Sequence, residues 1–345
     1  MRTAVISGPR EVAVEERDDP VLPGPDGAVV QVSLSAICGS DMHFYDGDIP
    51  MYPVAVGHEA VGTVLEVGSD VSTVSVGDKV LVASVAGCGH CEGCTTHRDP
   101  ILCESGAKVF GAGELGGAQA DALAVPGADF QLMRIPDGID DEAALLLTDN
   151  LATGWAGAKR ADVVPGSTVL VIGLGAVGLC AVRSALALGA ERVLVADPVE
   201  GRRARAVASG AIALEGPTAE AVLAATGGRG ADAVIDAVAK DATLDDAFAS
   251  VRAGGTINVI GVHDLNPYPL GVLMGLYRSI TLRMTTAPIH ATWPELVPLI
   301  QEGGIDTTGV FTHHFALDDA AAAYAAVAER SADCVKVTLR PEGWA

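Results

Sequence analysis

The sequence contains few basic residues and few aromatic residues. Its 345 residues include 22 Lys and Arg against 44 Asp and Glu, which gives a formal net charge of -22, and Phe, Trp and Tyr together make up 4%. An acidic surface repels the phosphates of nucleic acids and of anionic lipids, because binding to either depends on Lys and Arg. We therefore expect neither a nucleic acid nor a membrane among the partners.

Long apolar runs are also missing. No stretch of about 18 uninterrupted apolar residues occurs, and the nearest approach is TVLVIGLGAVGLCAV at 168–182. Residues 1–20 lack the apolar core of a signal peptide. We expect a soluble, cytoplasmic protein. Its length fits two domains of ordinary size, and its 49% hydrophobic residues are sufficient for two cores.

The pattern of apolar residues changes along the chain. Before about residue 130, β-branched runs such as 28–37 and 77–84 are separated by Gly, Pro and Asp, which predicts an antiparallel β domain, a barrel or a sandwich. From about residue 167, apolar segments alternate with Ala-rich segments, which predicts parallel strands, crossover helices and a doubly wound α/β domain. The predicted strands are 167–173, 191–197, 231–238, 255–261 and, as a further strand of the sheet, 279–286. We expect the tail to fold back onto the first domain.

A glycine-rich segment, GLGAVG, follows the first of these predicted strands. Its spacing is typical of the turn from a strand into a helix that binds a dinucleotide. A glycine in this turn lets the backbone approach a pyrophosphate, whose charge is favoured at a helix N-terminus. The residues expected to contact the cofactor are Gly173, Gly175, Ala176, Val177 and Gly178.

Asp197 stands at the end of the next predicted strand, 19 residues after Gly178. A carboxylate at this place hydrogen-bonds an adenosine ribose and repels the 2′-phosphate of NADP, which favours NAD. Arg202 and Arg203 are close enough in sequence to leave NADP open. Asp197 also fits the cap of a helix that starts near Val199, and the two roles can coexist.

Four of the seven cysteines form the pattern C-x2-C-x2-C-x8-C: Cys88, Cys91, Cys94 and Cys103. An odd number of cysteines without an export signal argues against a disulfide framework. Four thiolates at this density match a closed, structural zinc site. A ferredoxin-type iron–sulfur segment shares the first spacings, but the long last gap disfavours it. A nucleic-acid zinc ribbon is disfavoured by the acidic charge. His90 and His97 are interpreted as solvated loop residues.

A second set of metal ligands is spread over a longer stretch of the sequence. Cys38 begins the segment CGSDMH, and His58 stands in GHE. Either residue alone could be an ordinary buried side chain. Together they offer two zinc ligands, and an open catalytic site needs a third protein ligand. Asp149 is the best candidate, because a carboxylate in its apolar surroundings is costly without a cation beside it.

These segments resemble, in kind and order, those of the zinc-dependent medium-chain alcohol dehydrogenases. The resemblance covers essentially the whole chain, and TDNLATG at 148–154 resembles the formaldehyde dehydrogenase-like branch most. It implies a GroES-like β-barrel catalytic domain, residues 1–152 completed by 291–345, and a Rossmann domain with a doubly wound parallel sheet, residues 153–290. One departure is the last gap of the cysteine loop, which is one residue longer than usual.

Matching positions imply roles for individual residues. The assignments are Cys38, His58 and Asp149 to the catalytic zinc, Glu59 to its surroundings, Ser40 and His43 to a proton relay, and Thr153 and Lys336 to the cofactor. A surface His43 without a role is the alternative interpretation.

The sequence thus predicts hydride transfer between an alcohol, or the matching aldehyde or ketone, and a nicotinamide cofactor, with one catalytic and one structural zinc per chain. We expect NAD as the cofactor and a homodimer or homotetramer. A polyol or amino-alcohol dehydrogenase is the alternative. A zinc-free reductase or a non-catalytic nucleotide-binding homologue is disfavoured by the presence of all three zinc ligands.

Overall fold

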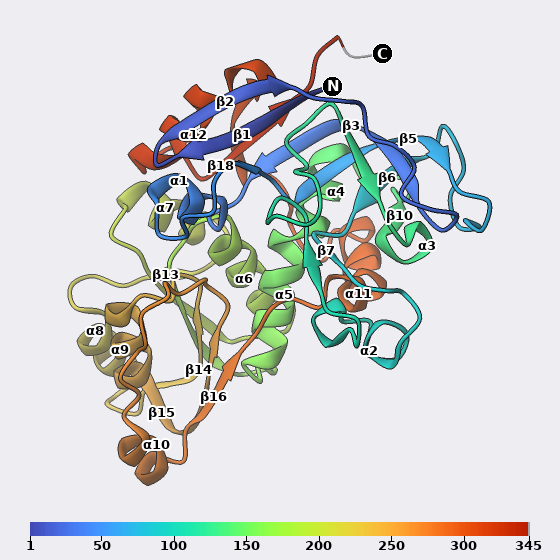
Figure 1. The fold of residues 1–345 in the computed structure, drawn as a ribbon. Coiled ribbons are helices and arrows are strands. Elements are labelled where there is room, and N and C mark those ends of the chain that lie inside the picture. The colour runs from blue at the N-terminus through green and yellow to red at the C-terminus, as the bar shows by residue number, and fades with distance from the viewer. Residues whose placement is uncertain (344–345) are drawn as a thin grey trace. The chain divides into compact units, whose positions relative to one another are not determined.

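The computed structural model describes residues 1–343, which divide into two compact units (Figure 1). Unit 1 contains residues 1–149, 288–302 and those from 307 onward, and unit 2 contains residues 150–287 and 303–306. Among the described residues, no helix is both long enough and apolar enough to cross a membrane.

Unit 1 is built on β-sheets whose strands pair almost entirely antiparallel. One sheet has the order β2-β1-β4, a larger one has the order β10-β6-β5-β3-β18-β17 with β9 also paired to β3, and β7 pairs with β8. The strands are β1 (Arg2–Gly8), β2 (Glu11–Glu16), β3 (Ala28–Ile37), β4 (Val54–Ala55), β5 (Glu59–Val67), β6 (Lys79–Val82), β7 (Val85–Ala86), β8 (Lys108–Val109), β9 (Ala122–Val125), β10 (Leu132–Arg134), β17 (Phe311–Ala316) and β18 (Lys336–Arg340). Valine and alanine side chains from β3, β5, β6 and β9 form one core of this unit.

The tail of the chain, from residue 307 onward, is part of unit 1. β18 pairs antiparallel with β3, so that Val337 lies opposite Ile37, and it pairs parallel with β17. The helices of this unit are α1 (Asp41–Asp46), α2 (Glu92–Thr95), α3 (Ala128–Gln131), α4 (Asp141–Thr148), α11 (Ile289–Gln301) and α12 (Ala320–Glu329), with short 3-10 turns at Pro100–Leu102 and Leu317–Asp319. The pairing of β18 with β3 brings the start of β18 close to the residues that follow Ile37.

Unit 2 is a six-stranded, fully parallel sheet in the order β13-β12-β11-β14-β15-β16. The strands are β11 (Thr168–Ile172), β12 (Arg192–Ala196), β13 (Ile212–Ala213), β14 (Ala231–Asp236), β15 (Val251–Val259) and β16 (Thr281–Met284). The helices are α5 (Asn150–Arg160), α6 (Ala176–Ala187), α7 (Glu200–Ala208), α8 (Thr218–Ala225), α9 (Asp241–Ser250) and α10 (Val272–Arg278). The strand order reverses between β11 and β14, and ligands of doubly wound sheets bind at such a reversal. The predicted fold class is confirmed.

Candidate functional site

Four potential metal ligands of unit 1 lie together although they come from three parts of the sequence. Cys38 follows β3, His58 and Glu59 stand at the start of β5, and Asp149 follows α4. One potential ligand atom from each lies within 4.8 Å of the others. The structure therefore brings together the three residues predicted as zinc ligands and the carboxylate predicted to be near them.

Asp41 lies on the Nδ1 side of the His58 ring, and the ligand group lies on the Nε2 side. Its Oδ2 accepts a hydrogen bond of 2.9 Å from the Cys38 backbone N–H, and its Oδ1 lies 3.5 Å from His58 Nδ1. The other ring nitrogen, Nε2, lies 3.3 Å from Asp149 Oδ2. A histidine that binds a metal usually donates its second ring N–H to a carboxylate in this way. Sequence reasoning missed Asp41, although it lies within CGSDMH.

Glu59 is buried beside the same group and forms an ion pair with Lys336. Lys336 Nζ lies 2.5 Å from Glu59 Oε1. Burial raises the pKa of Glu59, and Lys336 opposes that effect. Burial acts to lower the pKa of Lys336, but Glu59, Cys38 and Asp149 together outweigh it, so the pKa of Lys336 is raised. The resemblance implied a cofactor contact for Lys336, and in unit 1 its side chain is paired with Glu59.

The chemistry of the donor set fits a zinc ion. A thiol, an imidazole nitrogen and carboxylates are the ligand types that zinc prefers, and three protein ligands are typical of a catalytic site. Burial acts to lower the pKa of His58, yet Cys38, Asp149 and Asp41 raise it well above its usual value. The surroundings of His58 are therefore strongly negative and favour a cation. Cys38, His58 and Asp149 would hold the metal.

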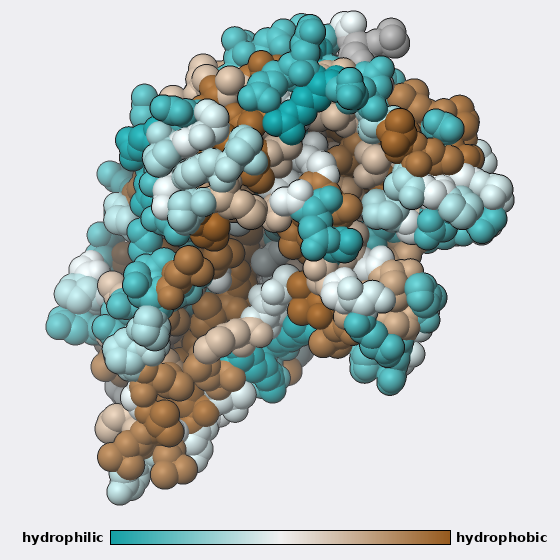
Figure 2. Space-filling view, viewed as in Figure 1, coloured by the Kyte–Doolittle hydropathy of each residue, from teal (hydrophilic) through white to brown (hydrophobic). Residues whose placement is uncertain are grey.

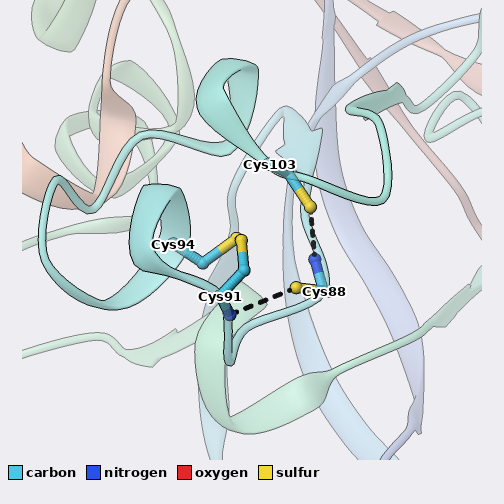
Figure 3. A group of neighbouring side chains, drawn as sticks. All are labelled: Cys88, Cys91, Cys94 and Cys103. Atoms are coloured by element: carbon cyan, nitrogen blue, oxygen red, sulfur yellow. Dashed lines mark hydrogen bonds between the residues drawn. The ribbon is translucent and has the colours of Figure 1, made fainter.

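The four clustered cysteines also converge, as Figure 3 shows. The Cys88 backbone N–H lies 3.2 Å from Cys103 Sγ, the Cys91 N–H lies 3.4 Å from Cys88 Sγ, and Cys91 Sγ lies 3.6 Å from Cys94 Sγ. Hydrogen bonds, first among them one with the Glu104 backbone, lower the pKa of Cys91 to about 6. Burial raises the pKa of Cys94 to about 12. This arrangement fits four thiolates around one zinc ion.

The two histidines of the cysteine loop lie outside that group. His90 Nδ1 is 2.8 Å from the Cys88 carbonyl oxygen, and the side chain of His97 is 54% exposed and lies 3.9 Å from Glu92. Neither belongs to the potential ligand set of the four cysteines.

In unit 2, the glycine-rich segment connects β11 to α6, with Gly175 as the residue preceding the helix. Gly173 has a φ of +84°, which favours glycine, and a Cβ at Gly178 would lie 1.8 Å from the Gly173 carbonyl oxygen. A Cβ at Gly175 would meet nothing within 4 Å. Two glycines are thus required by the turn, while the third borders open space at a helix N-terminus, where a pyrophosphate fits.

Asp197 follows β12 beside this turn. Its Oδ2 accepts a hydrogen bond of 2.7 Å from the Leu174 backbone N–H, and its Oδ1 accepts one of 2.8 Å from the Val199 N–H. The residue that precedes α7 is Val199, so Asp197 is not itself the N-cap. Arg203 Nη1 donates a hydrogen bond to the Asp197 carbonyl oxygen. Asp197 therefore also fixes the turn.

The remaining predicted residues are found on helices or beside them. Ser40 precedes α1 and is half-buried. His43 lies on α1, and its Nδ1 is 3.0 Å from Asp48 Oδ2. Thr153 lies on α5 in unit 2. Asp48 was missed by sequence reasoning, and only its position five residues after His43 could have indicated it.

Comparison with known proteins identifies the family. Residues 24–137 match the family model "Alcohol dehydrogenase GroES-like domain" and residues 176–302 match "Zinc-binding dehydrogenase". The chain is 59% identical over 343 residues to the probable zinc-binding alcohol dehydrogenase Rv1895 of Mycobacterium tuberculosis, covering 99% of this chain and 89% of that protein. It is 30% identical over 359 residues to sorbitol dehydrogenase of Bacillus subtilis, covering 99% and 97%.

Among solved structures, alcohol dehydrogenase TADH from Thermus sp. ATN1 superimposes with a TM-score of 0.92 at 34% identity, covering 99% of this chain and 100% of that chain. The two matched models describe a GroES-like domain and a zinc-binding dehydrogenase domain, and the family uses zinc and a nicotinamide dinucleotide. The protein is an enzyme of the alcohol dehydrogenase type, an oxidoreductase. The chain belongs to the zinc-dependent alcohol dehydrogenases of the medium-chain dehydrogenase/reductase superfamily.

Proposed function

We propose that the protein is an NAD-dependent alcohol dehydrogenase in which Cys38, His58 and Asp149 hold a catalytic zinc, and in which the four clustered cysteines hold a structural one. The observation that carries this proposal is the group of one thiol, one imidazole and two carboxylates whose ligand atoms lie within 4.8 Å of one another and of which only Asp149 is partly exposed. In the same proposal, residues 1–152 with 291–345 form the catalytic domain and residues 153–290 form the nucleotide-binding domain.

When bound, zinc supplies a Lewis acid for the substrate oxygen, and the nicotinamide supplies the redox partner. The chain's own residues position and deprotonate the substrate. In this proposal Ser40, two residues from Cys38, accepts the proton of the hydroxyl group as it releases its own, and His43 passes a proton on to solvent. The half-buried His43 has Asp48 as its hydrogen-bond partner, and the side chain of Asp48 is 52% exposed. Both side chains of this pair are in contact with water, because that of His43 is 19% exposed.

Asp197 supports NAD as the cofactor. Its carboxylate is fixed beside the glycine-rich turn by two backbone N–H groups. A carboxylate at this position of a dinucleotide-binding fold would repel the 2′-phosphate of NADP. The substrate is proposed to be a primary or secondary alcohol, with TDNLATG as the reason to favour the formaldehyde dehydrogenase-like branch. A polyol is the second candidate, because sorbitol dehydrogenase is among the relatives that span the chain.

Metal content and turnover of Asp149→Ala test the proposal. We expect two zinc ions per wild-type chain by elemental analysis, and reduction of NAD by some member of a panel of alcohols and polyols. Asp149→Ala should lose one zinc and nearly all turnover while still binding NADH. Asp140→Ala is the matched control, because Asp140 caps the other end of α4 through its hydrogen bond from the Ala143 N–H. It should keep both zinc ions. A wild-type chain with one zinc, or no turnover with any substrate of the panel, would contradict the proposal.

We also propose that the chain forms a homodimer through α10 and β16 of unit 2. Figure 2 shows hydrophobic surface where Figure 1 labels α10. β16 ends the strand order of its sheet, and an edge strand next to apolar side chains fits a second copy related by twofold symmetry. The apolar side chains that are 62% to 79% exposed in this region are Leu265, Val272, Leu273, Met274, Leu276, Tyr277 and Met284.

Light scattering after size-exclusion chromatography checks this assembly. Leu273→Glu should halve the molar mass, or reduce a tetramer to dimers. Val21→Glu, at an exposed apolar residue of unit 1, should leave the mass unchanged. A wild-type monomer would rule the interface out.

A further inference from the structure

Gln119 is a buried amide next to the candidate zinc site, and nothing in the sequence singled it out. Its side chain has no exposed surface. Its backbone N–H donates to the Val56 carbonyl at 3.1 Å, and its own carbonyl accepts from the Ala4 N–H at 2.8 Å. The backbone of Gln119 is therefore fixed between two neighbouring segments of unit 1.

All polar atoms of the Gln119 side chain are paired. Nε2 donates to Asp41 Oδ2 at 3.1 Å and to the Ala36 carbonyl at 3.3 Å. Oε1 accepts a hydrogen bond of 3.0 Å from the Tyr324 hydroxyl. Turning the amide over would place Oε1 against the Asp41 carboxylate and the Ala36 carbonyl, which offer it no hydrogen, so the surroundings permit one orientation.

We propose that Gln119 is a positioning residue for the zinc ligand His58 and acts through Asp41. Gln119 Nε2 and the Cys38 N–H both donate to Asp41 Oδ2, which leaves Oδ1 directed at His58 Nδ1. Nε2 of His58 is thereby directed at the group of ligands that contains Asp149. Losing the bond from Gln119 would let the Asp41 carboxylate rotate, and the imidazole would lose its fixed orientation.

Gln119 also contacts the backbone that precedes His58. Gly57 has a φ of +95°, and a Cβ there would lie 2.5 Å from Gln119 Cγ. The Gly57 carbonyl accepts a hydrogen bond of 2.8 Å from the Ala118 N–H. The same segment thus holds His58 twice, at its backbone through Gly57 and at its ring through Asp41.

Tyr324 extends the chain of hydrogen bonds to α12, in the tail of the sequence. Its side chain is fully buried, and burial raises the pKa of its hydroxyl. A buried hydroxyl without a partner is costly, so the bond to Gln119 also stabilises the position of α12. The tail therefore contributes to the zinc site through Tyr324, Gln119 and Asp41.

This inference rests on the proposed function, because it needs a zinc ion on His58. The test is the affinity of the protein for that zinc, measured by competition with a chromogenic chelator. Cys38→Ser shows whether the more weakly bound of the two zinc ions is the one at His58. Gln119→Met keeps an unbranched side chain against Gly57 and removes the hydrogen bonds. We expect about tenfold weaker binding at the Cys38 site, the lower end of what residues behind metal ligands contribute. Binding at the four cysteines should be unchanged.

Asn258→Leu is the matched control, since Asn258 is a buried amide of unit 2 that donates to the Gly157 carbonyl and accepts from the Thr285 hydroxyl. It should lower the melting temperature without changing zinc affinity. Tyr324→Phe is a milder variant, in case Gln119→Met does not fold, and should weaken the same zinc by a smaller factor.

The outcomes separate the two proposals. A wild-type chain with a single zinc at the four cysteines would refute the proposed function. If the wild type holds two zinc ions, two results would refute the role of Gln119 and leave the proposed function standing. One is an unchanged zinc affinity in both Gln119→Met and Tyr324→Phe. The other is an equal weakening of zinc binding in Asn258→Leu.

Discussion

Lys336 Nζ donates a 2.5 Å hydrogen bond to Glu59 Oε1, and only 3% and 0% of the two side chains are exposed. Lys336 begins β18 and Glu59 begins β5, so the ion pair joins strands that lie on either side of β3 in the large sheet. Both ions have lost most of their hydration, and each is stable there because the other is present. The ammonium of Lys336 also places a positive charge beside Cys38 and Asp149 of the candidate zinc site.

Replacing Lys336 by Met should therefore destabilise unit 1 strongly. An uncompensated buried charge costs about 3–5 kcal/mol, and Lys336→Arg should recover part of it. Unfolding by denaturant, followed in zinc-free protein, measures the difference. Lys108→Met is the control, because Lys108 and Glu114 form an exposed pair at 2.7 Å whose loss should cost less than about 1 kcal/mol. Equal, small effects of Lys336→Met and Lys108→Met would contradict the argument.

The sequence predicted the parts of the site that short segments encode. Cys38 and His58 stand within recognisable segments, and the glycine-rich turn of unit 2 follows from the spacing of three glycines. The parallel strands of unit 2 were predicted because each is a short apolar run between helical segments, and Thr168–Ile172 lies within the predicted 167–173.

The supporting residues could not be predicted, because they are brought together only by tertiary structure. Hydrogen bonds connect Asp41 to Gln119 and Gln119 to Tyr324. Gln119 and Tyr324 are 205 residues apart in the sequence. Lys336 meets Glu59 across 277 residues, through the pairing of β18 with β3. No local periodicity carries such information, since strand pairing in an antiparallel sheet is not limited to sequence neighbours.

Substituting Cys94 should separate structural from catalytic zinc. Cys94 is fully buried among the four clustered cysteines, so Cys94→Ser removes one ligand from a closed site whose metal binding contributes to folding. We expect one zinc per chain, low soluble yield and a lower melting temperature. Cys334→Ser, at a buried cysteine outside both groups of ligands, should keep two zinc ions. Normal stability in a Cys94→Ser protein that has lost a zinc would show that this metal is not structural.

Replacing Asp197 by Gly should reduce the preference for NAD over NADP. The variant loses a ribose acceptor and a charge that repels the 2′-phosphate, and charged hydrogen bonds contribute about 1.5–3 kcal/mol each, so a change of at least about tenfold in the ratio of kcat/KM is expected. The turn will also loosen, because Leu174 and Val199 lose their acceptor. An improved kcat/KM with NADP in the variant would show a change in cofactor preference and not merely damage to the turn. Equal use of both cofactors by the wild type would refute the assignment.

His290 should make the protein sensitive to mild acid. It is fully buried on α11 and stacked at 4.0 Å on Phe130, and among the described residues neither ring nitrogen has a hydrogen-bond partner. Burial lowers its pKa to about 3. The unfolded chain therefore takes up a proton near pH 6.5 that the folded chain refuses, so stability falls as the pH drops below about 6.5 and continues to fall toward about 3.

From pH 7 to pH 5 this single histidine accounts for about 2 kcal/mol of lost stability. His290→Leu should remove that part of the pH dependence, whatever its effect at neutral pH, as measured by denaturant unfolding at both pH values. His97→Leu, at an exposed histidine, should leave the pH dependence as it is in the wild type. The same loss between pH 7 and pH 5 in His290→Leu and wild type would show that His290 is not held neutral.

His43 and Asp48 provide the test of the proton relay. If His43 carries the proton from Ser40 toward solvent, His43→Gln should slow alcohol oxidation most at low pH, where water is a poor proton acceptor, and small buffer bases should restore part of the rate. Asp48→Asn weakens the 3.0 Å contact with His43 Nδ1 and should slow the reaction less, with the same pH trend. Ser40→Ala should have the largest effect, because it removes the group that this relay assigns to accept the proton of the reacting hydroxyl. His97→Gln serves as the control at an exposed histidine and should keep the wild-type profile. A pH profile for His43→Gln identical to that of the control, with no rescue by buffer, would make His43 a surface residue without a role in proton transfer.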